Sequence, residues 1–262
     1  MMPWLCLERC NFTTPQVQQH INTLLGPDQG CLWSAVSYER FNLGAHSTLV
    51  VDSTLTLPSS QLASHGMPAL PMISSYPYPP QLLDWMRQVW QEPKPFLSSL
   101  RQHAQELGAA GVNFDWEPSA SVPAPTSEDA AAYAGFLAQA VTALAPLRVT
   151  VDVARWSAVW NYTKLAQVPG LVVTTMSTYV ADDKIWQQEF DAAVASFQPD
   201  QLVVGLEHSF PNGTAYPQAM VAARLQACWD AGIRAIAVWD VPVPAPFTAA
   251  LQAFQPASLH AL

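Results

Sequence analysis

Two carboxylates and an amide alternate with large apolar residues over one short stretch of the chain. Asn113, Asp115 and Glu117 are separated by Phe114 and Trp116. Side chains alternate between the two faces of a β-strand, so the three polar groups share one face. A strand in the wall of a parallel barrel has this character, since its outer face packs on helices and its inner face opens into an active site. The alternation also fits a half-exposed antiparallel strand with a solvated polar face.

Carboxylates two residues apart on one strand suit glycoside hydrolysis. That reaction needs one acid held protonated while a neighbouring carboxylate stays ionised. Aromatic residues at the ends of later strands, such as Tyr179 and Trp239, would supply flat apolar surfaces for a sugar ring and a hydroxyl donor. The sequence therefore predicts Asp115 and Glu117 as a catalytic pair.

Composition excludes several other classes of function. The net charge is −9 and only 12% of residues are charged, which argues against a nucleic-acid partner and fits uncharged ligands such as sugars. No apolar run approaches the ~18 residues of a membrane span. The candidate residues include no lysine for Schiff-base chemistry and no histidine cluster for a metal, and we expect neither metal nor organic cofactor.

The elements that would position these residues follow an α/β pattern. The length of 262 residues is close to the ~250 typical of one eight-fold barrel. We predict a single (β/α)8 TIM barrel over residues 31–262, preceded by an N-terminal extension over 1–30 that contains a helix. The expected strands cover residues 31–38, 47–52, 69–74, 111–117, 147–153, 171–177, 202–206 and 233–238.

Residues at the carboxyl ends of these strands are the candidates for chemistry. Beyond the pair above they are Tyr38, Glu39, Asp52, Ser74, Ser75, Asp152, Arg155, Tyr179, Glu207, His208, Trp239 and Asp240. Asp152 could tune the site or satisfy hydrogen bonds inside the barrel. Tyr38 is interpreted primarily as an aromatic side chain of the core or rim, and secondarily as a flat surface on which a sugar ring stacks. Glu207 and His208 have two interpretations. Either they contact substrate, or one of them faces a helix or solvent.

Gly111-Val-Asn-Phe-Asp-Trp-Glu resembles the fourth-strand signature of glycoside hydrolase family 18, Asp-Gly-x-Asp-x-Asp-x-Glu, and most of all its di-N-acetylchitobiase branch, where Asn at the middle position is familiar. Val149-Thr-Val-Asp-Val-Ala resembles that branch's fifth strand. Ser177-Thr-Tyr-Val lies where the family has Met-x-Tyr-Asp, and Val238-Trp239 at its eighth-strand tryptophan. The resemblance spans roughly residues 31 to 240.

The resemblance implies a role for each matched residue. Glu117 would be the general acid, Asp115 would orient the substrate's 2-acetamido group, and Tyr179 would hold that group's carbonyl. The acetamido group itself is the nucleophile in this family, so the outcome implied is retention through an oxazolinium intermediate, without metal or cofactor. The substrate-binding candidates are Trp239 as the floor under the sugar, Asn113 as a supporting hydrogen-bonder, Asp152 and Tyr38.

The chain departs from the family pattern at several places. Ala110 replaces the first Asp of the signature, and Ser177 and Val180 replace the Met and Asp around Tyr179. Only about ten residues separate the seventh strand from its helix, so we expect the α+β insertion domain of many chitinases to be absent and the site to be shallow.

These observations favour a glycosidase that cleaves β-linked N-acetylglucosamine in chitobiose, chitooligosaccharides or N-glycan cores. The alternatives are a catalytically silent, glycan-binding barrel and a barrel enzyme of another chemistry. Retention of Glu117 favours the glycosidase over the silent barrel, and no other inward constellation supports a third chemistry.

Three glycosylation sequons, at Asn11, Asn161 and Asn212, indicate the secretory pathway, with a lysosomal or extracellular destination, although no signal peptide is evident. The four cysteines allow three sets of two disulfides, and Cys6 with Cys10 is plausible in an oxidising compartment. We expect a monomer.

Overall fold

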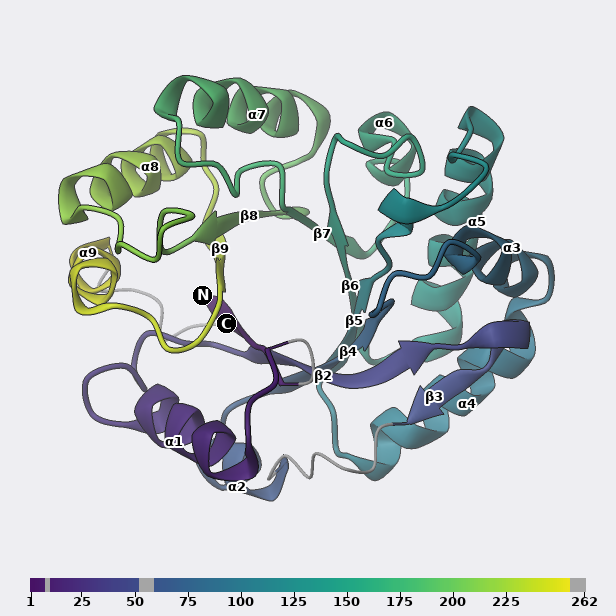
Figure 1. Ribbon diagram of the computed structural model, residues 1–262, viewed down its shortest axis with the longest axis horizontal. Coiled ribbons are helices and arrows are strands. Elements are labelled where there is room, and N and C mark those ends of the chain that lie inside the picture. Colours follow the sequence, from purple (N-terminus) through teal and green to yellow (C-terminus); the bar gives the residue numbers. More distant parts are fainter. Residues whose placement is uncertain (8–9, 52–58, 255–262) are drawn as a thin grey trace.

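In the computed structural model, which describes residues 1–7, 10–51 and 59–254, parallel strands close into a barrel with helices around its outside (Figure 1). The candidate Asp52 lies outside the described residues. The eight barrel strands are β1 (Met2–Leu5), β2 (Val36–Leu43), β4 (Ala69–Ser74), β5 (Gly111–Asp115), β6 (Arg148–Val153), β7 (Leu171–Thr175), β8 (Leu202–Glu207) and β9 (Ala235–Trp239). The predicted (β/α)8 TIM barrel is confirmed.

The first strand of the ring comes from the segment that the sequence assigned to an N-terminal extension. β1 pairs in parallel with β2 through Trp4 and Ser37, and with β9 through Pro3 and Val238. Placing Met2–Leu5 outside the barrel is therefore wrong. Four residues that include a proline carry too little periodicity to predict a strand, and this one has partners on both edges only once the ring closes.

The second expected strand, over residues 47–52, does not belong to the ring. Its described part, β3 (Leu49–Val51), pairs antiparallel with β2, opposite Leu43 and Phe41, on the edge of β2 that β1 occupies further back at Ser37 and Tyr38. The five residues between β2 and β3 suffice for a hairpin, whereas a parallel neighbour needs a crossover of a dozen residues or more. The sequence prediction omitted β1 from the barrel and wrongly included β3. The two errors cancel in the numbering, so β5 is the fourth strand of the barrel, as predicted.

Helices surround the ring and fix the outward faces of its strands. They are α1 (Thr14–Leu25), α2 (Ser59–Ser64), α3 (Leu82–Gln91), α4 (Pro93–Glu106), α5 (Ser127–Leu144), α6 (Tyr162–Leu165), α7 (Asp183–Ser196), α8 (Gln218–Asp230) and α9 (Ala245–Phe254), with short 3-10 turns at Ala45–Ser47 and Pro118–Ala120. The ten residues between β8 and α8 form a loop with one isolated bridge, so the expected absence of an insertion domain there is confirmed. Within the described residues, none of the helices combines the length and apolar character needed to cross a bilayer.

The two faces of β5 have opposite environments. Phe114 and Trp116 are fully buried on the outer side, where Trp116 packs on Phe96 of α4 and both rings contact Phe136 of α5, at centroid distances of 5.7, 5.5 and 5.3 Å. Burying each ring contributes roughly 1.5–3 kcal/mol to stability. A Cβ at Gly111 would lie 2.5 Å from the carbonyl oxygen of Arg148, so only glycine lets β5 approach β6 here. β5 is thus a barrel wall and not a half-exposed strand.

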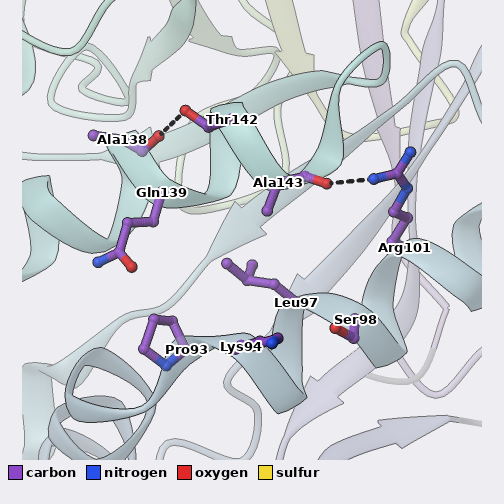
Figure 2. A pocket seen from close by; sticks show the side chains of 9 residues that line it. All are labelled: Pro93, Lys94, Leu97, Ser98, Arg101, Ala138, Gln139, Thr142 and Ala143. Atoms are coloured by element: carbon purple, nitrogen blue, oxygen red, sulfur yellow. Dashed lines mark hydrogen bonds between the residues drawn. The ribbon is translucent and has the colours of Figure 1, made fainter.

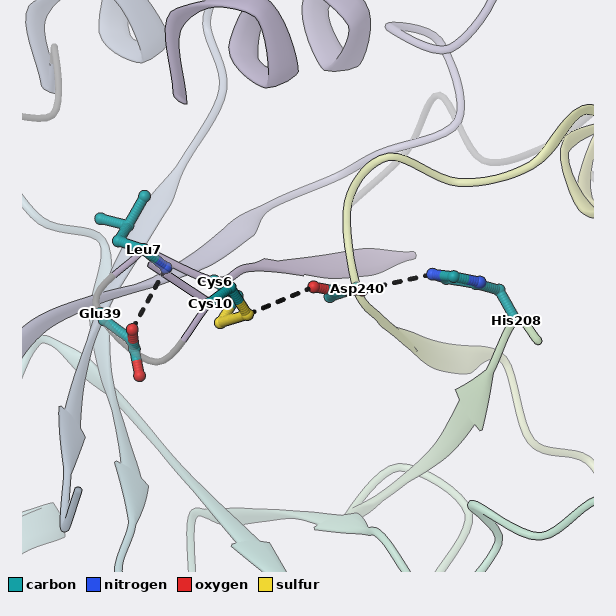
Figure 3. Close-up of a disulfide and its surroundings, with 6 residues drawn as sticks. All are labelled: Cys6, Leu7, Cys10, Glu39, His208 and Asp240. Atoms are coloured by element: carbon teal, nitrogen blue, oxygen red, sulfur yellow. Dashed lines mark hydrogen bonds and ion pairs between the residues drawn. A yellow bond between two sulfur atoms is a disulfide. The ribbon is translucent and has the colours of Figure 1, made fainter. Parts of the chain in front are cut away.

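A short cross-linked segment follows β1. Cys6 and Cys10 form a disulfide, the pairing that the sequence left conditional, and Cys10 Sγ lies 3.9 Å from Asp240 Oδ2 (Figure 3). The backbone N–H of Leu7 donates to Glu39 Oε2 at 3.2 Å. The segment after β1 is therefore tied to β2 and to the loop after β9, its two neighbours in the ring.

Candidate active site

A cavity of about 210 Å³ opens at the carboxyl ends of the barrel strands. Five residues singled out from the sequence meet in it, and the full lining is Trp4, Met72, Asp115, Glu117, Asp152, Trp156, Met176, Tyr179 and Trp239. The barrel thus brings residues from its first, third, fourth, fifth, sixth and eighth strands, or the turns that follow them, to one place. This is where barrel enzymes carry their chemistry.

Glu117 lies just past the end of β5, before the 3-10 turn Pro118–Ala120, and is positioned by the loop that follows β4. Ser75 Oγ accepts the backbone N–H of Glu117 at 2.9 Å and donates to the carbonyl oxygen of Asp115 at 3.3 Å. Tyr78 Oη donates to Glu117 Oε1 at 3.0 Å. The carboxyl group of Glu117 is therefore held at the half-buried rim, with one oxygen already engaged by a hydroxyl that a ligand could replace.

Asn113 lies beneath the cavity rather than in its lining. Its side chain is fully buried, its Nδ2 donates to Asp152 Oδ2 at 2.5 Å, and its Oδ1 accepts from Thr150 Oγ1 at 2.5 Å. This network spans β5 and β6 below the floor of the site. The geometry is that of a supporting residue, which has no direct access to a ligand.

Asp152 is a buried acid whose neighbours favour its neutral form. Its side chain is only 1% exposed. Burial raises the pKa of Asp152 well above its ordinary value and the nearby Asp115 charge adds to the rise, while the hydrogen bond from Asn113 partly offsets it. Both sequence interpretations of Asp152 apply, since it takes part in the barrel's hydrogen bonds and also lines the cavity.

Tyr179 is carried by a tight turn after β7. Its backbone N–H donates to the carbonyl oxygen of Met176 at 2.9 Å, and Thr178 Oγ1 donates to the carbonyl oxygen of Gly205 at 2.6 Å. A Cβ at Gly205 would lie 2.6 Å from Tyr179 Cε1, so glycine is required for the ring to lie against β8.

The hydroxyl of Tyr179 is buried and has no hydrogen-bond partner among the described residues. Burial, followed by the charges of Asp152 and Asp115, raises the pKa of Tyr179 well above its ordinary value. The hydroxyl therefore stays protonated and is a donor whose acceptor must come from a ligand or from solvent.

Aromatic side chains form the rest of the wall. The ring of Trp4 lies 6.0 Å from that of Tyr179 and 6.2 Å from that of Trp239, centroid to centroid. Trp156, 56% exposed, lies at the mouth. Sequence reasoning missed Trp4 because β1 was not predicted. It missed Trp156 although that residue directly follows the candidate Arg155, the available signal.

The motif on the sixth barrel strand is shifted by one residue from the sequence interpretation. Ser177 was matched to the family's Met, but Met176 is the residue whose side chain lines the cavity. Ser177 Oγ instead accepts the backbone N–H of Arg155 at 2.8 Å and so ties the loop after β6 to that after β7. One additional residue therefore separates the thioether from Tyr179.

Other candidates lie away from the cavity. Tyr38 is 1% exposed and packs in the hydrophobic core, so its interpretation as a core aromatic fits better than that as a sugar platform. Glu207 and His208 do not line the cavity. His208 Nε2 lies 3.2 Å from Asp240 Oδ1 instead (Figure 3).

A larger hollow of about 670 Å³ lies between α4 and α5 on the outside of the barrel (Figure 2). Its ionisable residues are Lys94 and Arg101, and Arg101 Nη1 donates to the carbonyl oxygen of Ala143 at 3.1 Å. It contains no carboxyl group and no side chain from the ends of the strands. By size alone this hollow would be the candidate active site. The residues that could do chemistry instead line the smaller cavity.

The described residues include one group with potential metal ligands, Cys6, Cys10 and Asp240. The two sulfurs are bonded to each other, so neither is available as a thiolate ligand. The group gives no support for a metal centre.

Comparison with known proteins shows which solved structures share this fold. No protein-family model matches the chain, and no curated protein is significantly similar to it in sequence. The structure is similar to a chitinase from Chromobacterium violaceum ATCC 12472, with a TM-score of 0.76, 13% identity, and 97% of this chain and 98% of that one covered.

Two further solved structures show the same similarity. For the spore cortex-lytic enzyme SleL of Bacillus cereus, the TM-score is 0.77 at 12% identity, with 97% and 73% covered. For a mutant class V chitinase from Nicotiana tobaccum in complex with NAG4, it is 0.72 at 12% identity, with 97% and 98% covered. At these identities the shared property is a chitinase-like barrel fold.

Proposed function

We propose that this protein is a glycoside hydrolase of the family 18 type that cleaves β-linked N-acetylglucosamine by a retaining, substrate-assisted mechanism. The observation that carries the proposal is the convergence of Glu117, Asp115 and the unpartnered Tyr179 hydroxyl on one cavity with aromatic walls. The chitinase-like barrel supports it at the level of the fold.

The mechanism assigns one task to each group. Glu117, at the rim, gives its proton to the glycosidic oxygen. Asp115 accepts the N–H of the substrate's 2-acetamido group, and Tyr179 donates to its carbonyl oxygen, so that this oxygen faces the anomeric carbon. Attack by that oxygen forms an oxazolinium ion as the leaving sugar departs. Water, deprotonated by Glu117, then opens the ion from the side of the departed sugar, which gives retention.

The size of the cavity limits what the substrate buries. About 210 Å³ is below the roughly 300–1,000 Å³ usual for ligand pockets. We propose that one acetamido sugar enters, over Trp239, while the next unit rests on the exposed Trp156. Chitobiose, short chitooligosaccharides and trimmed N-glycan cores meet this requirement.

The alternative is a barrel that binds such glycans without cleaving them. The hydrogen-bonded placement of Glu117 by Ser75 and Tyr78 favours the enzyme, because a binding protein has no need for a carboxyl group held at the rim.

We also propose a secretory-pathway protein that acts as a monomer. All three sequon asparagines, Asn11, Asn161 and Asn212, are exposed. Asn161 Oδ1 accepts from the backbone N–H of Lys164 at 3.1 Å, which leaves its Nδ2 available for a glycan. The Cys6–Cys10 disulfide supports folding in an oxidising compartment.

Glu117→Gln tests the proposed function. The amide cannot donate a proton to the leaving oxygen, so we expect kcat on a chromogenic chitobioside to fall by about 10²–10⁴-fold. Calorimetry should show chitooligosaccharide binding within a few-fold of wild type, since the shape of the site is kept.

Glu106→Gln, an exposed carboxylate at the end of α4, is the control and should keep full activity. Full activity in Glu117→Gln would contradict the assigned acid. Glycan binding by a wild type that cleaves no acetamido sugar would select the silent barrel.

A further inference from the structure

Two buried acids face each other across the boundary between β5 and β6. The register pairs Phe114 with Val151, so the next residue on each strand brings Asp115 beside Asp152. Both line the cavity, and they are 3% and 1% exposed. Every lining side chain that can carry charge at neutral pH is a carboxyl group, the third being Glu117. Two adjacent carboxyl groups in a water-poor site cannot both ionise at ordinary cost, so the arrangement favours a proton on Asp152.

The hydrogen bonds below the cavity fix where the second acid points. Thr150 Oγ1 donates to Asn113 Oδ1, which turns the Asn113 amide N–H towards Asp152 Oδ2. Asp152 is thereby held by one oxygen from below, and its carboxyl group is presented to Asp115 at the level of the cavity. Burial and the Asp115 charge both raise the pKa of Asp152, which agrees with Asp152 as the site of the proton.

None of the other titratable groups that the structure describes around the pair supplies a positive charge. Glu117 adds negative charge from the rim, and Tyr179 and Tyr133 contribute hydroxyls whose pKa values are raised by burial and by these same acids. Glu117 therefore favours a protonated Asp152, whereas the two tyrosines stay neutral and add no positive charge that would stabilise a second anion.

We propose that Asp152 is a positioning residue for Asp115: its carboxyl group, anchored by Asn113, shares one proton with Asp115 and aims it at the substrate's acetamido N–H. This inference rests on the proposed function for its catalytic consequence only. The pair carries one negative charge and one proton both before and after Asp115 accepts the hydrogen bond from the acetamido N–H. Its protonation state is therefore unchanged by substrate binding.

Infrared spectroscopy of the ligand-free protein tests the shared proton. At pH 6, in a Glu117→Gln background that removes the proton of the general acid, the protein should show the carbonyl stretch of a protonated carboxylic acid that disappears when Asp152→Asn is added. Glu207→Gln is the matched control, because burial also raises the pKa of Glu207 and yet this side chain does not line the cavity. Its spectrum should keep the Asp152 band.

Kinetics test the positioning. We expect Asp152→Asn to lower kcat on the chitobioside by about 10–100-fold, the cost of a misaimed catalytic group, with KM changed less than three-fold. The double substitution Asn113→Asp with Asp152→Asn exchanges amide and carboxyl across the same hydrogen bond. It should restore the infrared band. It should also recover at least one third of the decrease in log kcat that Asp152→Asn causes.

An acid band that persists when Asp152→Asn is added to Glu117→Gln, or wild-type kcat in Asp152→Asn alone, would overturn the inference. If Asp152→Asn does not fold, the double substitution decides, because it keeps both groups: absence of the band there also overturns it. A wild type inactive on every acetamido sugar would refute the proposed function while leaving the infrared result to decide the shared proton.

Discussion

At the scale of single residues, the candidate site depends on groups of the same kind in different surroundings. Glu117 is half-buried at the rim, whereas Asp115 and Asp152 are enclosed. The Tyr179 hydroxyl is enclosed as well, and a buried hydroxyl without a partner costs about 1–3 kcal/mol of stability. Because Tyr179 lines the cavity, a ligand can supply the missing partner.

Replacement of Tyr179 by Phe should therefore separate activity from stability. We expect kcat/KM on the chitobioside to fall about 10²–10³-fold, as for loss of a donor to a developing charge. The midpoint of thermal unfolding should stay unchanged or rise, because the unpartnered hydroxyl is removed.

Tyr133→Phe is the control for this comparison. Tyr133 also has a buried hydroxyl without a partner among the described residues, but it lies on α5, outside the barrel. We expect a similar effect on unfolding and full activity. Equal activities of the two variants would contradict the role of Tyr179.

At the scale of elements, the wall behind β5 is held by the start of α5. Thr126 Oγ1 accepts the backbone N–H of Asp129 at 3.3 Å, and Asp129 Oδ2 accepts the backbone N–H of Thr126 at 2.8 Å, which is a capping box. Arg87 of α3 donates to both carboxylate oxygens of Asp129, at 2.8 and 2.9 Å. α3 is thus linked by an ion pair to α5, whose Tyr133 and Phe136 rings stack on Trp116.

This ion pair predicts a pH dependence of stability. Its hydrogen bonds from Arg87 hold the pKa of Asp129 below its ordinary value. A carboxyl group with a lowered folded pKa stabilises above its unfolded pKa, near 3.9, and loses that contribution as pH falls through the folded value. We expect Asp129→Asn to cost about 1 kcal/mol in urea unfolding at pH 7, with the difference shrinking towards pH 3.

Asp84→Asn is the control, because Asp84 meets the same arginine at 3.1 Å from a side chain that is 55% exposed. Its effect should stay below about 0.5 kcal/mol at every pH. A cost for Asp129→Asn that grows as pH falls would contradict the linkage.

At the scale of the whole molecule, the site exists only because β1 closes the ring. β1 joins β2 to β9, and its Trp4 reaches the cavity, where it packs on Tyr179 and Trp239. One short strand therefore completes both the hydrogen bonding of the barrel and the aromatic wall.

Trp4→Ala should damage both at once. Loss of a fully buried tryptophan costs about 3–5 kcal/mol, to be measured by denaturant unfolding, and we expect activity on the chitobioside to fall with it. Trp229→Ala is the control, since this ring is partly exposed on α8 beneath Arg234. It should cost well under half as much and leave activity intact. Wild-type stability of Trp4→Ala would show that β1 is dispensable.

The sequence by itself determined what depends on local periodicity. Strand and helix patterns repeat along the chain, so they predicted the barrel, and period-two alternation predicted which face of β5 carries Asn113 and Asp115. The sequence also predicted the missing insertion domain, because a ten-residue connection cannot contain one.

Only the tertiary structure decided what depends on contacts between distant segments. The closure by β1, the exclusion of β3, the entry of Trp4 and Met176 into the cavity, and the pairing of Asp115 with Asp152 all follow from strand register. Register is a relation between two strands whose hydrogen bonds form only when the ring is complete, and no local pattern encodes it. The sequence therefore specifies the types of the candidate groups, whereas the closed barrel decides which of them lie next to each other.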